Sequence, residues 1–192
     1  MYQNNEFKAV MLKDILLNTA ANKVLSFLTL HQDASFYDKE VSEKTGVSRG
    51  MTNMILRQFF DAGLLVREKR GRMWFYTLST KPLFKYYRVY ENLVNLENLV
   101  KALKPISQRV ILFGSTVKGE DTAESDIDLF ILTNNKDEVL RVIRNYQTDR
   151  EIKPVIQTPS EYAVSRKKDK AFYEEVAKGI VLFNKEPDEQ RL

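Results

Sequence analysis

The chain has 192 residues, no cysteine and a single histidine, His31, which excludes disulfide bonds, thiolate metal centres and histidine-based catalytic triads. With 43% hydrophobic and 29% charged residues, its composition is that of a globular protein with one or two domains. It contains no signal-peptide pattern and no apolar run near the roughly 20 residues of a membrane span, so we expect a soluble cytoplasmic protein.

The formal net charge of +4 is distributed unevenly along the chain. Residues 1–104 contain 16 Lys and Arg against 10 Asp and Glu, a net charge of +6, whereas residues 105–192 contain 14 against 16, a net charge of −2. A basic first part suits contact with nucleic acid, and an acidic second part suits metal binding.

The first predicted elements are three helices in succession. Residues 22–30 form an apolar helical run, and Asp38 is a candidate cap for a second helix that ends at Thr45. A tight turn at residues 46–48 then leads into a third helix, from Arg49 to about residue 62. The sequence therefore predicts a helix, a turn and a helix.

The third helix has an apolar and a polar face. Apolar residues and Thr52 are expected to face the core, whereas Arg49, Asn53 and Arg57 recur every four residues on the opposite face. Ser48 is the predicted N-cap of this helix. Arginine and asparagine are side chains that read base edges in DNA.

A basic hairpin is predicted after this helix. Two strand-like runs, residues 64–70 and 72–78, meet at Gly71. Residues 25–78 as a whole resemble a winged helix-turn-helix DNA-binding domain, most clearly in Gly-Val-Ser-Arg at 46–49 and Asp-Ala-Gly-Leu-Leu at 61–65. The resemblance implies that the Arg49 helix and Ser48 contact the major groove and that the hairpin cations meet phosphates: Arg67, Lys69, Arg70 and Arg72. Winged helices also dock proteins, so a protein-binding module remains an alternative.

Residues 83–104 are predicted to form one long helix. Its apolar residues lie three and four apart, as in a heptad stripe, over fewer than three heptads: Tyr86, Val89, Leu93, Leu96, Val100 and Leu103. Packing against the chain's own domains and a dimer seam are both compatible with this stripe. A homodimer is the expectation, because two-fold symmetry suits a DNA reader.

The strongest chemical signal lies in residues 110–132. An apolar run ends at Gly114-Ser115, and after ten residues comes Asp126-Ile-Asp128 followed by apolar residues. Glycine lets a phosphate approach the backbone, and a short helix after Ser115 would direct N–H groups at the anion. Two carboxylates on one face of a strand repel each other, and a hard cation such as Mg²⁺ removes that repulsion.

This constellation resembles the minimal nucleotidyltransferases of the DNA polymerase β superfamily. Ser125, before the first aspartate, and Lys118-Gly119 extend the resemblance over about residues 105–185. It implies that Gly114, Ser115, Lys118 and Ser125 bind a nucleoside triphosphate, with ATP as the expected one. It also implies that Asp126 and Asp128 are the Mg²⁺ ligands and catalytic residues.

One catalytic element of that family is missing from the sequence. Active members place a third carboxylate on a following strand, here expected at residues 151–158, and the aligned position falls at Val155. Glu151 lies about 13 Å from that position at strand rise. Lys153 is a candidate phosphate contact or a solvated lysine. The sequence therefore leaves open whether the domain is an enzyme.

The two resemblances together predict an α+β protein with two domains. Residues 1–81 are the expected winged helix-turn-helix, 82–104 a linker helix and 105–192 a nucleotidyltransferase-like domain, a small mixed β-sheet with flanking helices that include an amphipathic helix at 161–178. The leading hypothesis is a DNA-binding transcriptional regulator that binds NTP and Mg²⁺. The alternatives are an active transferase of NMP to a hydroxyl of a nucleic acid, a small molecule or a toxin-like protein partner, and a catalytically dead interaction module.

Overall fold

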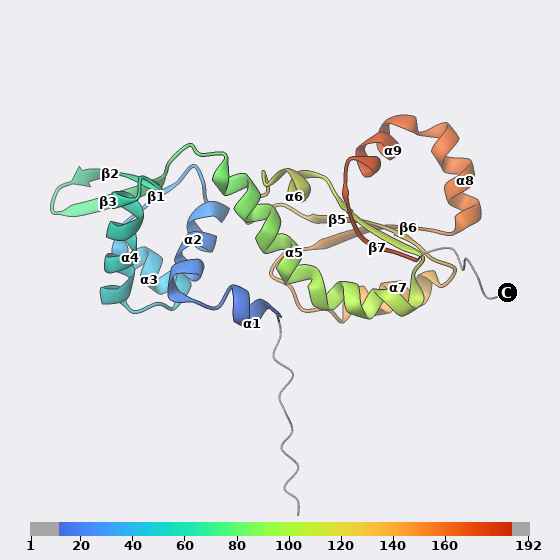
Figure 1. Ribbon diagram of the computed structural model, residues 1–192, viewed down its shortest axis with the longest axis horizontal. Helices are drawn as coiled ribbons and strands as arrows, with labels where there is room; N and C mark the ends of the chain where they lie inside the picture. The colour runs from blue at the N-terminus through green and yellow to red at the C-terminus, as the bar shows by residue number, and fades with distance from the viewer. Residues whose placement is uncertain (1–11, 186–192) are drawn as a thin grey trace, which may run out of the picture. The chain divides into compact units, whose positions relative to one another are not determined.

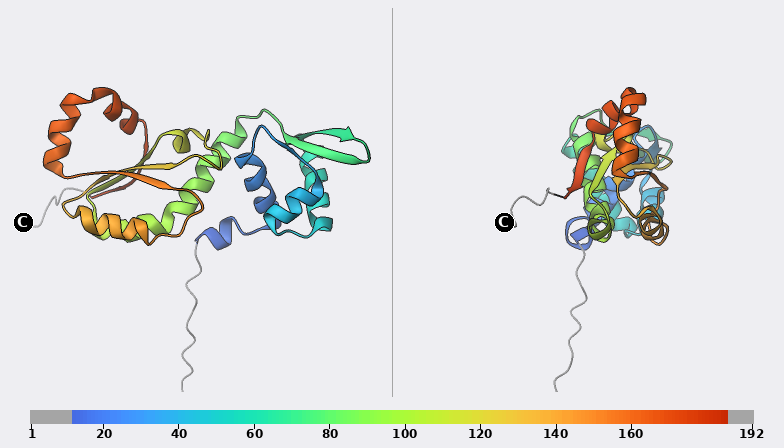
Figure 2. Two further views of the ribbon diagram at one scale, coloured as in Figure 1. Left: turned by 180° about the vertical axis from the view of Figure 1, so that it is seen from behind. Right: turned by 90° about the vertical axis from the view of Figure 1, so that its right-hand side faces the viewer.

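A computed structural model describes residues 12–185 and shows an α+β chain (Figures 1 and 2). The chain divides into two compact units between Phe84 and Lys85. The outer parts of the two predicted domains, residues 1–11 and 186–192, lie outside the described residues. None of the described helices has the length and apolar character needed to cross a membrane.

Four helices precede the hairpin in the described part of the first unit: α1 (Leu12–Leu16), α2 (Ala20–Leu30), α3 (Asp38–Thr45) and α4 (Arg49–Asp61). Thr19 caps α2 through its side chain, and Gly46 ends α3 in the left-handed conformation, at a φ of 68°. The prediction that Asp38 caps α3 is wrong. Tyr37 is the cap residue, its N–H donates to Glu40, and Asp38 is the first residue of the helix.

A three-stranded antiparallel sheet completes the first unit. Strands β2 (Leu65–Arg70) and β3 (Met73–Leu78) form the predicted hairpin, and the two-residue strand β1 (Ser35–Phe36) pairs with the other side of β3. Arg70 pairs with Met73 across a turn in which Gly71 has a φ of 61°. The basic segment around Gly71 is therefore a tight hairpin tip.

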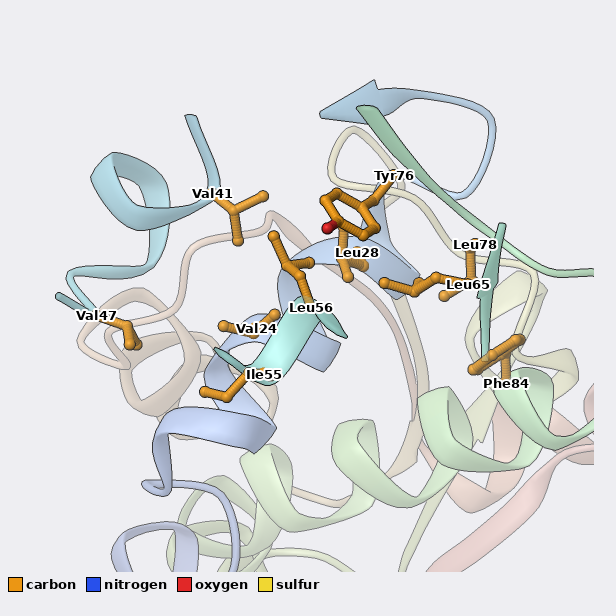
Figure 3. Close-up of a cluster of buried hydrophobic side chains, with 10 residues drawn as sticks. All are labelled: Val24, Leu28, Val41, Val47, Ile55, Leu56, Leu65, Tyr76, Leu78 and Phe84. Carbon is orange, nitrogen blue, oxygen red and sulfur yellow. The ribbon is translucent and has the colours of Figure 1, made fainter. Parts of the chain in front are cut away.

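The core of the first unit joins its helices to its sheet. Figure 3 shows Leu28 of α2, Leu56 of α4 and Tyr76 of β3 in one cluster of buried side chains. Thr52 and Ile55 of α4 are buried as well, which confirms the inward face predicted for this helix. Fully burying a large apolar side chain contributes roughly 1.5–3 kcal/mol, so this cluster fixes α4 against the rest of the unit.

Helix α5 (Leu83–Leu103) continues from the end of the first unit into the second. Leu96, Val100 and Leu103 of the predicted stripe are buried, but Tyr86 is 75% exposed and lies outside the buried face. Because Leu96 and Leu103 belong to the core of the second unit, this part of the stripe packs within the chain. The predicted homodimer therefore draws no support from it.

The second unit is built on a four-stranded mixed sheet in the order β6-β5-β4-β7. Strands β4 (Arg109–Phe113), β5 (Ile127–Leu132) and β7 (Ile180–Asn184) pair antiparallel, whereas β6 (Ile152–Gln157) runs parallel to β5. The mixed sheet was expected from the sequence. Helix α7 (Lys136–Arg144) provides the crossover between the two parallel strands.

Helices cover both faces of this sheet. Leu99 of α5 and Val139 of α7 pack with Leu129 on one face, whereas Tyr173 and Val176 of α9 (Lys170–Ala177) pack with Phe130 on the other (Figure 1). Helix α8 (Pro159–Lys168) ends at Asp169, whose carboxylate accepts the N–H of Phe172 and caps α9. The single amphipathic helix predicted over residues 161–178 is therefore two helices.

Two short helical elements connect the remaining parts. The 3₁₀ turn η1 (Lys104–Ile106) follows α5 and leads into β4, and the four-residue helix α6 (Ser115–Lys118) follows β4. The helix that the sequence predicts after Ser115 is thus present. It is followed by residues 119–126, which lead to β5.

Candidate functional site

The Gly-Ser pair and the two aspartates meet at one end of the second unit's sheet. Phe113, the last residue of β4, pairs with Asp128 of β5, so Gly114 lies directly beside the Asp128 side chain. Gly114 has a φ of 78° and a ψ of −151°, a backbone region that is essentially restricted to glycine. A β-carbon here would lie 2.3 Å from Asp128 Oδ2. Gly114 is therefore required both by its backbone and by its neighbour.

Helix α6 connects this glycine to the aspartate strand. Ser115 is half-buried and begins the helix, and the side chain of buried Thr116 donates to the carbonyl of Asp126 at 3.4 Å. Lys118, a predicted nucleotide-binding residue, forms an ion pair of 2.6 Å with Glu175 of α9. This pairing raises the pKa of Lys118 and lowers that of Glu175.

Ser125 lies in the turn before the first aspartate. Its Oγ accepts the N–H of Thr122 at 2.9 Å, and its own N–H donates to the carbonyl of Thr122 at 3.1 Å. In this arrangement Ser125 shapes the loop that leads to Asp126. Its predicted contact with a nucleotide stays a prediction.

Lys153 of β6 lies beside the two aspartates. In the parallel register Asp128 pairs with Lys153, and Lys153 Nζ is 2.5 Å from Asp126 Oδ2. Val155, which aligns with the third carboxylate of the family, does not lie beside the aspartates: it pairs with Phe130 and packs in the apolar cluster beneath α9. The residue of β6 that lies beside the two aspartates is therefore a cation, Lys153.

The electrostatics of the site reflect this crowding. Partial burial raises the pKa of Asp128, and the nearby negative charge of Asp126 raises it further, while Lys153 acts in the opposite direction. The ion pair with Asp126 raises the pKa of Lys153. The ammonium of Lys153 thus compensates the negative charge of Asp126 more directly than that of Asp128.

The donor set fits one hard cation better than a closed metal cage. Within residues 12–185 no group of three or more Asp, Glu, His or Cys side chains could hold a metal ion. Magnesium is commonly bound by one or two carboxylates together with substrate phosphates, which Asp128 and Asp126 could provide with a triphosphate above Gly114. When bound, such an ion would neutralise phosphate charge.

A buried polar network, which the sequence analysis missed, supports the loop before the aspartates. Asp121 is fully buried and accepts hydrogen bonds from Arg88 and Asn92 of α5 and from Arg150, which lies just before β6. Arg88 also pairs with Glu91, and Arg150 donates to Asn92 at 2.6 Å. Two cations and two anions therefore compensate one another inside the unit.

This network holds three chain segments together next to the site. Asn92 contacts the carbonyl of Thr116 in α6 at 3.5 Å, and Gly119, two residues before Asp121, lies against the backbone of Lys85. A β-carbon at Gly119 would lie 2.1 Å from the Lys85 carbonyl oxygen. Buried charge pairs are costly to break, so the path of residues 119–121 is fixed against α5.

In the first unit, the predicted DNA-reading residues lie along α4. Arg57 is exposed and Asn53 half-buried, but the guanidinium of Arg49 binds Asp38 through two hydrogen bonds, of 2.9 and 3.1 Å. This contact lowers the pKa of Asp38. Ser48 is the N-cap residue of α4 but makes no side-chain capping bond. Arg49 therefore links α4 to α3 as well as facing solvent.

The hairpin cations stack on aromatic rings. The guanidinium of Arg67 lies 4.1 Å from the ring centre of Phe60 and 4.3 Å from that of Trp74, and Arg70 lies 4.7 Å from that of Phe75 while pairing with Glu68. Lys69 is 5.9 Å from the Trp74 ring. Arg72 lies exposed at the hairpin tip. These contacts hold the stacked cations in defined orientations.

Comparison with known proteins bears mainly on the second unit. Residues 95–188 match the family model described as polymerase beta, nucleotidyltransferase. No curated protein matches the chain. A solved structure described as TrmBL2, an archaeal chromatin protein with a novel mode of DNA binding, is 14% identical over 84% of this chain and 74% of that chain. Its TM-score of 0.29 is too low to support any conclusion about fold or function.

Proposed function

We propose that the chain is a DNA-binding regulator whose second unit binds a nucleoside triphosphate, with ATP as the expected one, together with Mg²⁺. The observation that carries the proposal is the close approach of Gly114 to Asp128, within the residues that match the polymerase beta nucleotidyltransferase model. Because Gly114 has no side chain, the Asp128 carboxylate lies directly against the end of β4. This contact places a candidate metal ligand beside the Gly114-Ser115 backbone, where the phosphates are proposed to bind.

The individual residues have separate roles in this proposal. The backbone at Gly114 and the hydroxyl of Ser115 contact the phosphates, and Asp128 with Asp126 binds the ion that the triphosphate shares. Lys118 and Ser125 are secondary contacts, since one is paired with Glu175 and the other lies in the turn with Thr122.

The first unit is proposed to be a winged helix-turn-helix that binds duplex DNA. Three helices followed by a hairpin, with the element order α2-β1-α3-α4-β2-β3, support this assignment. Helix α4 would enter the major groove through Asn53 and Arg57, and Arg72 at the hairpin tip would meet phosphate. The net charge of +6 on residues 1–104 favours this use of the unit.

Nucleotidyl transfer is the second candidate function, and the pair Asp126 and Asp128 favours it. The acceptor would be a hydroxyl of a nucleic acid, a small molecule or a toxin-like protein. The position of Lys153 weakens this candidate, because it lies where a further carboxylate would accept the proton of the attacking hydroxyl. A homodimer and a cytoplasmic location remain predictions.

Thermal unfolding tests the nucleotide site. Wild type is compared with Asp126→Ala/Asp128→Ala, with and without Mg²⁺ and each NTP. A ligand at a hundred times its dissociation constant stabilises the folded state by about 2.7 kcal/mol. A magnesium-dependent rise in melting temperature that the double variant lacks is the expected result, and equal behaviour of the two proteins would refute the site.

Duplex retardation tests the DNA-binding proposal separately. Binding should weaken steeply as salt concentration rises, because neutralised phosphates release counterions. No retardation of any duplex at low salt would reject the proposal and favour a protein-docking module.

A further inference from the structure

Lys153 is built into the centre of the proposed nucleotide site. Its strand position is directly opposite Asp128, and its ammonium contacts Asp126 at 2.5 Å. The side chain of Lys153 is 57% exposed and that of Asp126 is 32% exposed, so the pair stands at the surface where a ligand arrives.

The ammonium next to Asp126 limits how many divalent ions can bind at the aspartate pair. Two-metal sites hold their ions about 3.5–4 Å apart and use shared carboxylates to do so. An ammonium in contact with Asp126 occupies one cation position next to that carboxylate and repels a divalent ion from it. Among the described residues no ammonium or guanidinium group forms an ion pair with Asp128, although Lys153 lies opposite it in the strand register.

We propose that the Lys153 ammonium is a resident cation that takes the place of one of two divalent ions at this site. The inference rests on the proposed nucleotide-binding function and specifies its chemistry. The domain binds one divalent ion, held by Asp128, the triphosphate and the Asp126 oxygen that Lys153 does not contact, while the Lys153 ammonium stays on Asp126 Oδ2 and faces the phosphates.

A fixed ammonium differs from a metal ion in what it can do. It attracts phosphate oxygens, but it does not lower the pKa of a coordinated hydroxyl as a divalent ion does. The site therefore retains a nucleotide without activating an acceptor. A domain that binds a nucleotide without transferring it would act as a nucleotide sensor attached to the DNA-binding unit.

The number of bound ions provides the test. The full chain is titrated with Mn²⁺ in the presence of an ATP analogue whose α,β bridge is a methylene group, and bound Mn²⁺ is counted by electron paramagnetic resonance. Wild type and Lys153→Arg should each bind about one ion per chain, and Lys153→Asp should bind about two, with spin coupling between neighbouring ions.

Lys136→Asp is the matched control. Lys136 also pairs with a surface carboxylate at 2.5 Å, that of Glu161, but the pair is formed by α7 and α8 rather than by the aspartate strand. This variant should bind one ion, as wild type does. Without metal, Lys153→Asp should melt at a lower temperature than wild type and gain more from added Mn²⁺, because three carboxylates then repel one another.

The outcomes separate the inference from the function on which it rests. Two ions in wild type, or one ion in Lys153→Asp, would overturn the resident cation while leaving nucleotide binding in place. If neither nucleotide nor Mn²⁺ binds to wild type or to any variant, the proposed nucleotide site is rejected and the inference with it. One ion in wild type and two in Lys153→Asp support both.

Discussion

Replacing Gly114 by alanine should destabilise the second unit and disturb the aspartate pair. An L-residue in the backbone region of Gly114 costs about 1–3 kcal/mol. The added β-carbon would also lie 2.3 Å from Asp128 Oδ2, where ordinary contacts begin at 3.4 Å, so the carboxylate must leave its position. A displaced rotamer adds about 0.5–1.5 kcal/mol, which gives a total loss of about 1.5–4.5 kcal/mol.

Urea unfolding measures this loss unit by unit. Trp74 is the single tryptophan and lies in the first unit, so its fluorescence follows that unit, whereas far-ultraviolet circular dichroism follows both. Gly114→Ala should lower the midpoint of the dichroism transition that belongs to the second unit. The Trp74 transition should be unchanged and serves as an internal control.

A double-mutant cycle separates the two causes of the loss. In an Asp128→Ala background the contact with the carboxylate is gone, so Gly114→Ala should cost only the backbone strain of about 1–3 kcal/mol. The coupling energy between the two positions should be about 0.5–1.5 kcal/mol. If Gly114→Ala costs the same in both backgrounds, within about 0.3–0.5 kcal/mol, the role assigned to Asp128 is refuted. If Gly114→Ala costs nothing in either background, the backbone strain is refuted.

Three further predictions concern buried charge, pH and DNA. Asp121→Ala should destabilise the second unit by about 3–5 kcal/mol, because Arg88 and Arg150 lose a buried partner. Glu120→Gln removes only an exposed ion pair with Lys85 and should cost far less. A loss below about 1 kcal/mol for Asp121→Ala would contradict the network. Because the folded pKa of Asp128 is raised above 3.8, its protonated form favours folding, and this contribution is lost as pH rises through the raised pKa. Asp128→Asn should therefore gain stability relative to wild type between pH 4 and pH 7, and a pH-independent difference in urea midpoints would contradict it. Arg72→Ala should weaken duplex binding equally for all sequences and reduce the salt slope by about 1, and a change of sequence preference would argue against a phosphate contact.

The sequence predicts most of what is local in this fold. The hairpin around Gly71, the helix after Ser115 and the shared face of the two aspartates follow from signals that span a few residues. The residues within a turn determine its geometry, and the two-residue period of a strand specifies which residues share a face.

Long-range register could not be predicted in the same way. Whether Lys153 or Val155 lies beside the aspartates depends on how α7 returns the chain to the sheet, and a shift of two residues along β6 exchanges one for the other. When the strand is aligned on the following Thr158, the third carboxylate of the family falls at Val155. The observed register instead packs Val155 under α9 and leaves Lys153 near the start of β6, in contact with Asp126.

The burial of the charged network could not be predicted from the sequence either. Arg88 and Glu91 lie outside the predicted apolar stripe of α5, and charged residues on a helix usually face solvent. Asp121, which pairs with Arg88, and Arg150, which pairs with Asp121, lie far along the chain, so no spacing rule connects them to α5. Because the stripe is defined by apolar residues alone, it includes the exposed Tyr86 and leaves out the buried Arg88 and Glu91.

The network around Asp121 also has a consequence for how this domain can change over generations. Losing one member of a compensated buried set leaves an uncompensated charge, which is more damaging than replacing the whole set by apolar residues. Arg88, Glu91, Asp121 and Arg150 should therefore be inherited as a group. Among homologues, the four positions should be charged together or apolar together, and chains with an intermediate pattern should be rare.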